Sequence, residues 1–148
     1  MVKEDVTMNH AKPAQNSDDP HILALFQRWS ISFEETCESF RALLGDSGVW
    51  IAGPEPIATA HGAEEAIALL EGFRASHGLA TIEVEVLNLG RCGPFAYSER
   101  IDHLVNSHGD RFISLPVAGV MRLDDDNRVA YWRDYWDMRE FLALPRHC

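Results

Sequence analysis

From residue 81 onward the chain is patterned as one strand after another, and this run constrains the fold more than any other feature. Four segments are expected to be strands, at residues 81–89, 95–105, 112–123 and 128–136. In the first of them, three apolar residues alternate with two glutamates, as in a strand with one buried face. The short segments between the four are rich in Gly, Asn, Asp and Ser, as hairpin turns are. We therefore predict an antiparallel meander.

Before this run, apolar residues recur at helical spacing. Asp19-Pro20 marks the start of a first helix, Ser32 opens a capping-box pattern for a second, and a third is expected over residues 63–76. Shorter elements are expected at residues 49–52, as a strand, and at residues 138–144, as a helix. Helices followed by an antiparallel meander are typical of an α+β fold. A twisted sheet wrapped by these helices would form a cone with an interior pocket.

Composition indicates a single domain and narrows its partners. With 148 residues and 46% hydrophobic content the chain can bury one core, and we expect a flexible tail over residues 1–19 before one domain over residues 20–148. The formal charge of −10 opposes nucleic-acid binding, and no apolar run has the length of a membrane span. Three cysteines without paired spacing favour reduced thiols and a cytoplasmic protein. The histidines lack metal-ligand spacing, so we expect no metal.

Two of the predicted strands carry charge where a strand usually carries core. Arg100 and Asp102 are two residues apart and share a face, and Asp134 shares a face with Trp132 and Trp136. Charged strand residues mostly form solvated faces with cross-strand ion pairs. Two tryptophans beside an aspartate rarely both face water, however. The sequence is therefore equally consistent with an interior Asp–Arg–Asp cluster and with a solvated face.

Such a cluster is suited to acid–base chemistry. The guanidinium of Arg100 can hold the carboxyl groups of Asp102 and Asp134 by paired hydrogen bonds. Because the trio would carry a net negative charge in an apolar pocket, one carboxyl group could keep its proton while the other stays ionised. One site would then offer a general acid and a general base. Opening of an epoxide suits this pair, since water is activated on one side and the oxygen is protonated on the other.

At these residues the chain resembles the limonene-1,2-epoxide hydrolase family, within the wider nuclear-transport-factor-like and SnoaL-like superfamily. The similarity extends roughly over residues 20–144 and is specific at residues 97–102 (YSERID), 119–123 (GVMRL) and 132–141 (WRDYWDMREF). The resemblance implies a curved, mixed, mostly antiparallel six-stranded sheet, wrapped by three to four helices around an apolar pocket. It also implies a homodimer.

The resemblance further implies roles for the charged residues. Asp134 would be the base that activates water, Asp102 would protonate the epoxide oxygen, and Arg100 would bridge the two. The reaction would add water to a small apolar epoxide in one step and give a vicinal diol, without a metal or an organic cofactor. The residues expected to bind the substrate are Trp50, Phe73, Leu104, Val117, Trp132 and Phe141.

The first predicted strand departs from the family pattern. Members of the family position the water with a Tyr and an Asn on this strand, whereas residues 49–53 here read VWIAG. Another donor, such as Ser32, Thr59 or His61, could replace the missing pair. Alternatively, Trp50 makes a drier pocket in which a hydroxyl of the substrate opens the epoxide internally, as in a cyclase, or in which an isomerisation takes place. A non-catalytic small-molecule binder is a third hypothesis, because fold does not determine function.

Overall fold

The computed structural model describes residues 19–55, 57 and 59–144. Residues 1–18 of the tail predicted over residues 1–19, and residues 145–148 of the predicted domain, lie outside the described residues. The described chain contains these elements: α1 (Pro20–Trp29), α2 (Phe33–Leu43), β1 (Leu44–Ile51), β2 (Thr59–His61), α3 (Gly62–His77), β3 (Leu79–Cys92), β4 (Phe95–Asn106), β5 (Arg111–Leu123), β6 (Val129–Tyr135) and α4 (Met138–Leu142).

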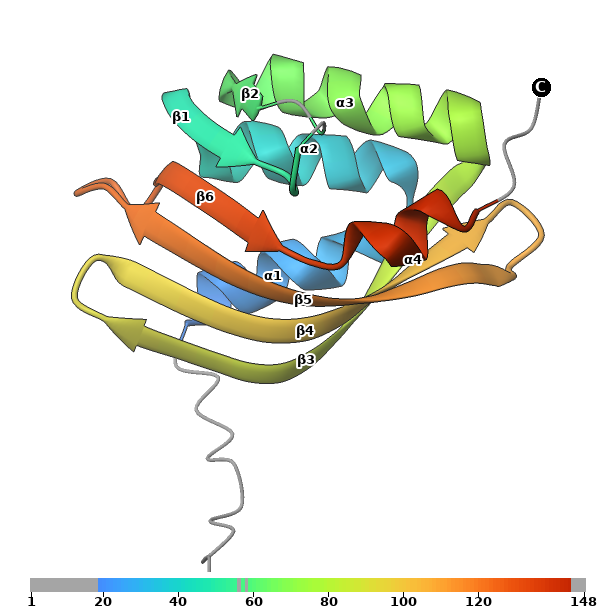
Figure 1. Ribbon diagram of the computed structural model, residues 1–148. Coiled ribbons are helices and arrows are strands. Elements are labelled where there is room, and N and C mark those ends of the chain that lie inside the picture. Colours follow the sequence, from blue (N-terminus) through green and yellow to red (C-terminus); the bar gives the residue numbers. More distant parts are fainter. Residues whose placement is uncertain (1–18, 56, 58, 145–148) are drawn as a thin grey trace, which may run out of the picture.

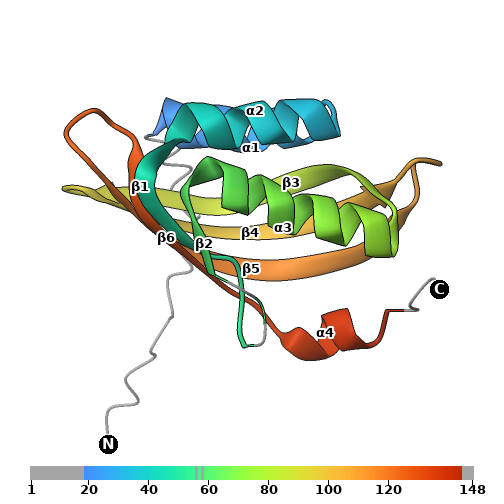
Figure 2. The same cartoon turned by 90° about the horizontal axis from the view of Figure 1, so that it is seen from above.

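The strands form one six-stranded sheet in the order β2-β1-β6-β5-β4-β3. Strands β3 to β6 form the predicted antiparallel meander, and β1 pairs with β6 in parallel. The sheet curves strongly, with α1, α2 and α3 along its inner side and α4 at one end (Figures 1 and 2). The prediction of an α+β fold with a mixed, mostly antiparallel sheet is therefore confirmed.

Local sequence explains where the helices begin and end. The side chain of Asp19 accepts hydrogen bonds from the amides of His21 and Ile22, so it caps α1. Asp19 is buried and pairs with Arg91, so this residue, expected at the end of the tail, belongs to the domain instead. Gly78 ends α3 with a left-handed backbone, at a φ of +72°.

The first strand differs from its prediction. It was expected over residues 49–52, but β1 begins at Leu44, directly after α2, and the short strand β2 pairs with it through Ala60. β1 does not alternate clearly, because Gly45 and Gly48 interrupt it. Gly48 is required at its position, since a Cβ atom there would lie 2.6 Å from the carbonyl oxygen of Val129. At Gly48, β1 and β6 thus lie too close together for a residue with a side chain.

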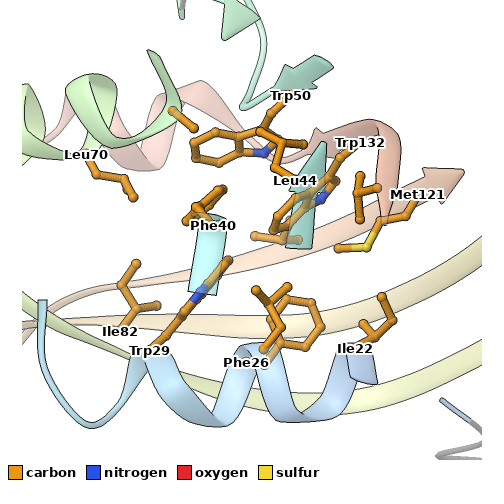
Figure 3. Packing of buried hydrophobic residues seen from close by; sticks show 14 of the residues in the cluster. Ile22, Phe26, Trp29, Phe40, Leu44, Trp50, Leu70, Ile82, Met121 and Trp132 are labelled. Carbon is orange, nitrogen blue, oxygen red and sulfur yellow. The ribbon is translucent and has the colours of Figure 1, made fainter. Parts of the chain in front are cut away.

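Aromatic rings fill the space between the sheet and the helices (Figure 3). Trp132 on β6 stacks on Trp29 of α1 at 5.8 Å and on Phe40 of α2 at 5.5 Å between ring centroids. Trp50 of β1 packs against the same indole at 5.5 Å. All four rings are buried, and burial of large aromatic side chains is a main source of core stability. This cluster forms the wall behind the charged residues described below.

The outer face of the sheet is much less covered. Tyr97 of β4 and Tyr135 of β6 are 48% and 50% exposed. On β5 between them, the exposed Ala118 pairs with Tyr135 and with Glu99, and Val120 pairs with Tyr97. In the described part of the chain, no helix is long and apolar enough to cross a membrane.

Candidate active site

Arg100 and Asp102 lie on the inner face of β4, as their spacing predicts. Arg100 is 1% exposed and Asp102 is 8% exposed. The guanidinium donates from Nε to Asp102 Oδ1 at 2.9 Å and from Nη2 to Asp102 Oδ2 at 3.2 Å. Its Nη1 donates to Ser98 Oγ at 3.2 Å, and its centre lies 4.9 Å from the ring centroid of Phe26. The guanidinium group of Arg100 is thus fixed by hydrogen bonds to side chains of β4 and by the ring of Phe26 on α1.

Asp134 reaches the same arginine from β6, across the intervening strand β5. Its Oδ2 lies 3.0 Å from Arg100 Nη2, and its side chain is 4% exposed. The residue of β5 between the two is Gly119, which pairs with both Ser98 and Asp134. A Cβ atom on Gly119 would lie 2.8 Å from Arg100 Nη1 and 2.9 Å from Asp134 Oδ1. The absence of a side chain at this position lets the ion pair form across the middle strand.

Two tryptophans donate to the carboxylate of Asp134. Trp132 Nε1 lies 2.9 Å from Oδ1, and Trp50 Nε1 lies 3.3 Å from Oδ2. Asp134 therefore accepts from two indoles and from Arg100, whereas Asp102 accepts side-chain hydrogen bonds from Arg100 alone among the described residues. Hydrogen bonds of this kind favour the ionised form of a carboxyl group. The two aspartates therefore have unequal surroundings.

The electrostatics of the cluster shift the pKa values of Asp102 and Arg100. Burial raises the pKa of Asp102 above its ordinary value, Arg100 opposes that shift, and the negative charge of Asp134 adds to it. Burial alone would lower the pKa of Arg100, but the charges of Asp134 and Asp102 outweigh burial and raise it. Arg100 is therefore a permanent cation, and Asp102 is the group that holds a proton more readily than an exposed aspartate.

The three charged side chains meet at an apolar cavity of about 140 Å³, which we call the inner cavity. Trp50, Phe73, Leu104, Val117 and Phe141, all expected to bind substrate, line it. Trp132, expected at the same surface, does not line the cavity and instead lies behind it, 1% exposed, in the aromatic cluster. The inner cavity is thus built from both helices and strands, with its charge on one wall.

The residues suggested as replacement donors do not reach this cavity. Ser32 caps α2, where its Oγ accepts from the amide of Glu35, and Thr59 and His61 are exposed on β2. None of the three lines the inner cavity. The sequence does not predict the hydrogen bond from Arg100 to Ser98 or the place of Gly119 beside Arg100, although both residues lie in segments that carry the family resemblance. It does not predict the indole contacts either, because they depend on the parallel pairing of Trp50 with Trp132.

The indole N–H groups of the tryptophans that line the inner cavity all donate to protein acceptors. Trp29 donates to Ser39 Oγ at 3.0 Å, Trp136 donates to the carbonyl oxygen of Ala52 at 2.8 Å, and Trp50 donates to Asp134. Among the described lining residues, the remaining polar side chains are Arg100, Asp102 and Asp134. In the described residues, no group of three or more His, Cys, Asp or Glu side chains is arranged to hold a metal ion.

Several solved structures share this fold. An LEH-like epoxide hydrolase of M. tuberculosis is similar over 82% of this chain and 84% of its own, with 24% sequence identity and a TM-score of 0.60. A protein of Catenulispora acidiphila with a ketosteroid isomerase-like fold matches with a TM-score of 0.68 at 17% identity, over 85% of this chain and 94% of its own. A Shewanella denitrificans protein assigned to the SnoaL-like polyketide cyclases matches with a TM-score of 0.64 at 15% identity, over 82% and 91% of the two chains. At these identities the likeness shows the fold alone.

The sequence itself matches a family model over residues 35–146. That model describes the limonene-1,2-epoxide hydrolase catalytic domain, and the matched segment contains Arg100, Asp102 and Asp134. The resemblance found at the charged strands is thereby confirmed. This chain belongs to the limonene-1,2-epoxide hydrolase family.

Proposed function

We propose that this protein is an epoxide hydrolase, which adds water to an apolar epoxide and releases a vicinal diol. One observation carries the proposal: Arg100 holds two carboxyl groups of unequal surroundings at the wall of an apolar cavity. Family membership supports the same chemistry. Burying charged groups costs desolvation free energy even when they are paired. Three buried charges beside a cavity are therefore more typical of a catalytic centre than of a simple apolar binding site.

The reaction would proceed in one step with divided roles. Asp134, ionised and oriented by Trp50, Trp132 and Arg100, takes a proton from water as the water oxygen forms a bond to one epoxide carbon. The bond from that carbon to the epoxide oxygen breaks, and the oxygen takes the proton of Asp102. The free enzyme is restored when Asp134 loses its proton and Asp102 regains one.

A single turnover in ¹⁸O-labelled water tests this proposal. A panel of apolar epoxides is mixed with excess enzyme, and the products are analysed by mass spectrometry. Direct attack by water predicts a diol that carries one solvent oxygen in this first turnover. An unlabelled first-turnover diol would mean that a carboxylate oxygen attacks instead, and no turnover of any epoxide would remove the proposal.

A second candidate is internal opening of the epoxide by a hydroxyl group of the substrate, as a cyclase would catalyse. It is favoured by the inner cavity itself, because no described Tyr, Asn, Ser or Thr side chain lines it to hold a water. The same acid and base would serve, with Asp134 taking the proton of the hydroxyl group. In labelled water, an unlabelled cyclic ether from a hydroxy-epoxide would identify this reaction.

We also propose a cytoplasmic homodimer, in which the outer face of the sheet forms the interface. Tyr97, Ala118 and Tyr135 are exposed there on three adjacent strands, and apolar surface of this kind often marks an interface. Light scattering after size exclusion should give twice the chain mass for the wild type. Ala118→Glu would place a second carboxylate beside Glu99 and next to Tyr135 and should yield monomers, whereas a monomeric wild type would exclude the dimer.

A further inference from the structure

The inner cavity is small for a substrate site. Its volume of about 140 Å³ is close to that of an engineered cavity that holds one benzene molecule, about 150 Å³. Pockets for larger organic ligands measure about 300–1,000 Å³. Only a part of a substrate the size of one ring therefore fits beside Arg100, Asp102 and Asp134, and a larger substrate must extend beyond the cavity.

A second cavity adjoins the first between α3 and α4, and we call it the outer cavity. Its volume is about 420 Å³, and it is lined by Gly72, Ser76 and His77 of α3 and by Leu142 of α4, among others. Leu69, Phe73 and Phe141 line both cavities. These three side chains therefore form the partition between the inner and the outer cavity.

The partition is made of side chains that rotamer changes can move. The ring centroids of Phe73 and Phe141 are 5.2 Å apart, and both residues are half-buried. The ring of His77 stacks on Phe73 at 4.5 Å and continues the aromatic surface into the outer cavity. An elongated molecule that passes between these rings would have contact with apolar or aromatic surface along its whole length.

We propose that the substrate occupies both cavities, with its ring-sized, epoxide-bearing part in the inner cavity and the rest in the outer one. This inference rests on the proposed function and deepens it. The outer part is uncharged, because no Lys, Arg, Asp or Glu is among the described residues lining the outer cavity. Ser76 offers a hydrogen bond to a hydroxyl or carbonyl group at its end. The substrate class is thus an elongated neutral epoxide with a polar far end.

Gly72 makes the outer cavity testable. A Cβ atom on this residue would meet nothing within 4 Å, so Gly72→Leu fills the outer cavity without a backbone clash, and it removes a glycine from a helix interior. The probes are a six-membered ring epoxide and the same ring with an eight-carbon chain ending in a hydroxyl group. In the wild type the chain should raise kcat/KM by about tenfold or more, since each added methylene in an apolar pocket contributes to discrimination.

Gly72→Leu should lower kcat/KM for the extended epoxide by about tenfold or more and leave the value for the simple ring epoxide unchanged. Ala75→Leu is the matched control, because Ala75 is exposed on the same helix and lines neither cavity. This control should leave both values unchanged. A chain that ends in a carboxylate should be a poorer substrate than the hydroxyl form. Equal losses for both epoxides, or no loss for either, would overturn the inference.

A binding measurement separates this inference from the proposed function. Trp136 and Trp50 line the inner cavity, so tryptophan fluorescence can follow binding of both probes whether or not they react. If the extended probe binds the wild type but binds Gly72→Leu at least about tenfold more weakly, the outer subsite stands even without turnover, and only the proposed reaction fails. Equal binding to both proteins, or no binding to the wild type, would contradict the subsite.

Discussion

Trp50 Nε1 donates to Asp134 Oδ2 at 3.3 Å, so the indole on β1 contacts the carboxylate expected to act as the base. Arg100 Nη2 lies 3.0 Å from the same oxygen, while Oδ1 accepts from Trp132. Each carboxylate oxygen can accept about two hydrogen bonds. The acceptor position left for the nucleophile is therefore on Oδ1, and Trp50 helps to determine which oxygen takes the proton.

Trp50→Phe removes this donor and keeps an aromatic ring. We expect kcat to fall by about tenfold or more, because a hydrogen bond to a charged group is worth about 1.5–3 kcal/mol. Initial rates of the two proteins over a range of epoxide concentrations measure this loss.

Trp29→Phe is the matched control for that substitution. Trp29 is also a buried indole in the aromatic cluster, but its N–H donates to Ser39 Oγ rather than to the carboxylate. We expect a comparable loss of thermal stability and a smaller loss of kcat, because no hydrogen bond to the carboxylate is removed. If both variants lower kcat equally, Trp50 acts only as packing.

Asp102 should make both activity and stability depend on pH. Burial raises the pKa of Asp102 in the folded protein above its unfolded value. The contribution of Asp102 to the free energy of unfolding is therefore complete below its unfolded pKa and is lost as the pH rises through its folded pKa. The loss is about 1.4 kcal/mol for each unit by which the two pKa values differ. Activity should fall over the same window, because the ionised form has no proton to give.

Urea denaturation at a series of pH values tests this linkage. Asp102→Asn stays neutral, so its free energy of unfolding should lack the decline that the wild type shows as the pH rises. Asp110→Asn, in the exposed turn after β4, serves as the control and should follow the wild type. A variant of Asp102 with the same decline as the wild type would show that another group titrates.

Gly119→Ala tests the geometry of the ion pair across β5. Its new methyl group would lie 2.8 Å from Arg100 Nη1 and from Ser98 Oγ, so these groups must move apart. We expect stability to fall by about 1–3 kcal/mol, as for other overpacked sites. Activity should fall by about a hundredfold, because displacements of about 1 Å at a catalytic site have effects of that size. Denaturation curves measure the loss of stability, and initial rates measure the loss of activity.

Gly90→Ala provides the comparison on β3. A Cβ atom on Gly90 meets nothing within 4 Å, so this substitution should leave activity unchanged. If Gly119→Ala is as active as the wild type, the contact between Arg100 and Asp134 does not depend on the missing side chain.

The part of the site that is local in sequence could be predicted. Alternation along a strand places Arg100 and Asp102 on one face, and the tryptophans beside Asp134 indicate that its face is covered. The hairpin turns correctly predicted the order of β3, β4, β5 and β6, which brings Asp134 to within one strand of Arg100. Short-range pattern was sufficient for these features because each depends on neighbours in the chain.

The part that depends on distant pairing could not be predicted. The contact of Trp50 with Asp134 requires β1 to pair in parallel with β6, and these strands are far apart in the sequence. No residue pattern on β1 signals this register, and its two glycines obscure the strand itself. The burial of Trp132 behind the inner cavity has the same cause, since Trp50 packs against it from the adjacent strand.

The central claim is that Asp134 and Asp102 act as base and acid in opening an epoxide, and the turnover of Asp134→Asn tests it most directly. This variant is compared with the wild type and with Asp125→Asn, which changes an exposed residue in the turn before β6, after circular dichroism has shown that all three are folded. The substrate is an epoxide that the wild type hydrolyses. We predict that kcat of Asp134→Asn falls by at least about a hundredfold, because general base catalysis contributes about 10²–10⁴-fold. The kcat of Asp125→Asn should equal that of the wild type. Turnover by Asp134→Asn at the wild-type rate would contradict the account.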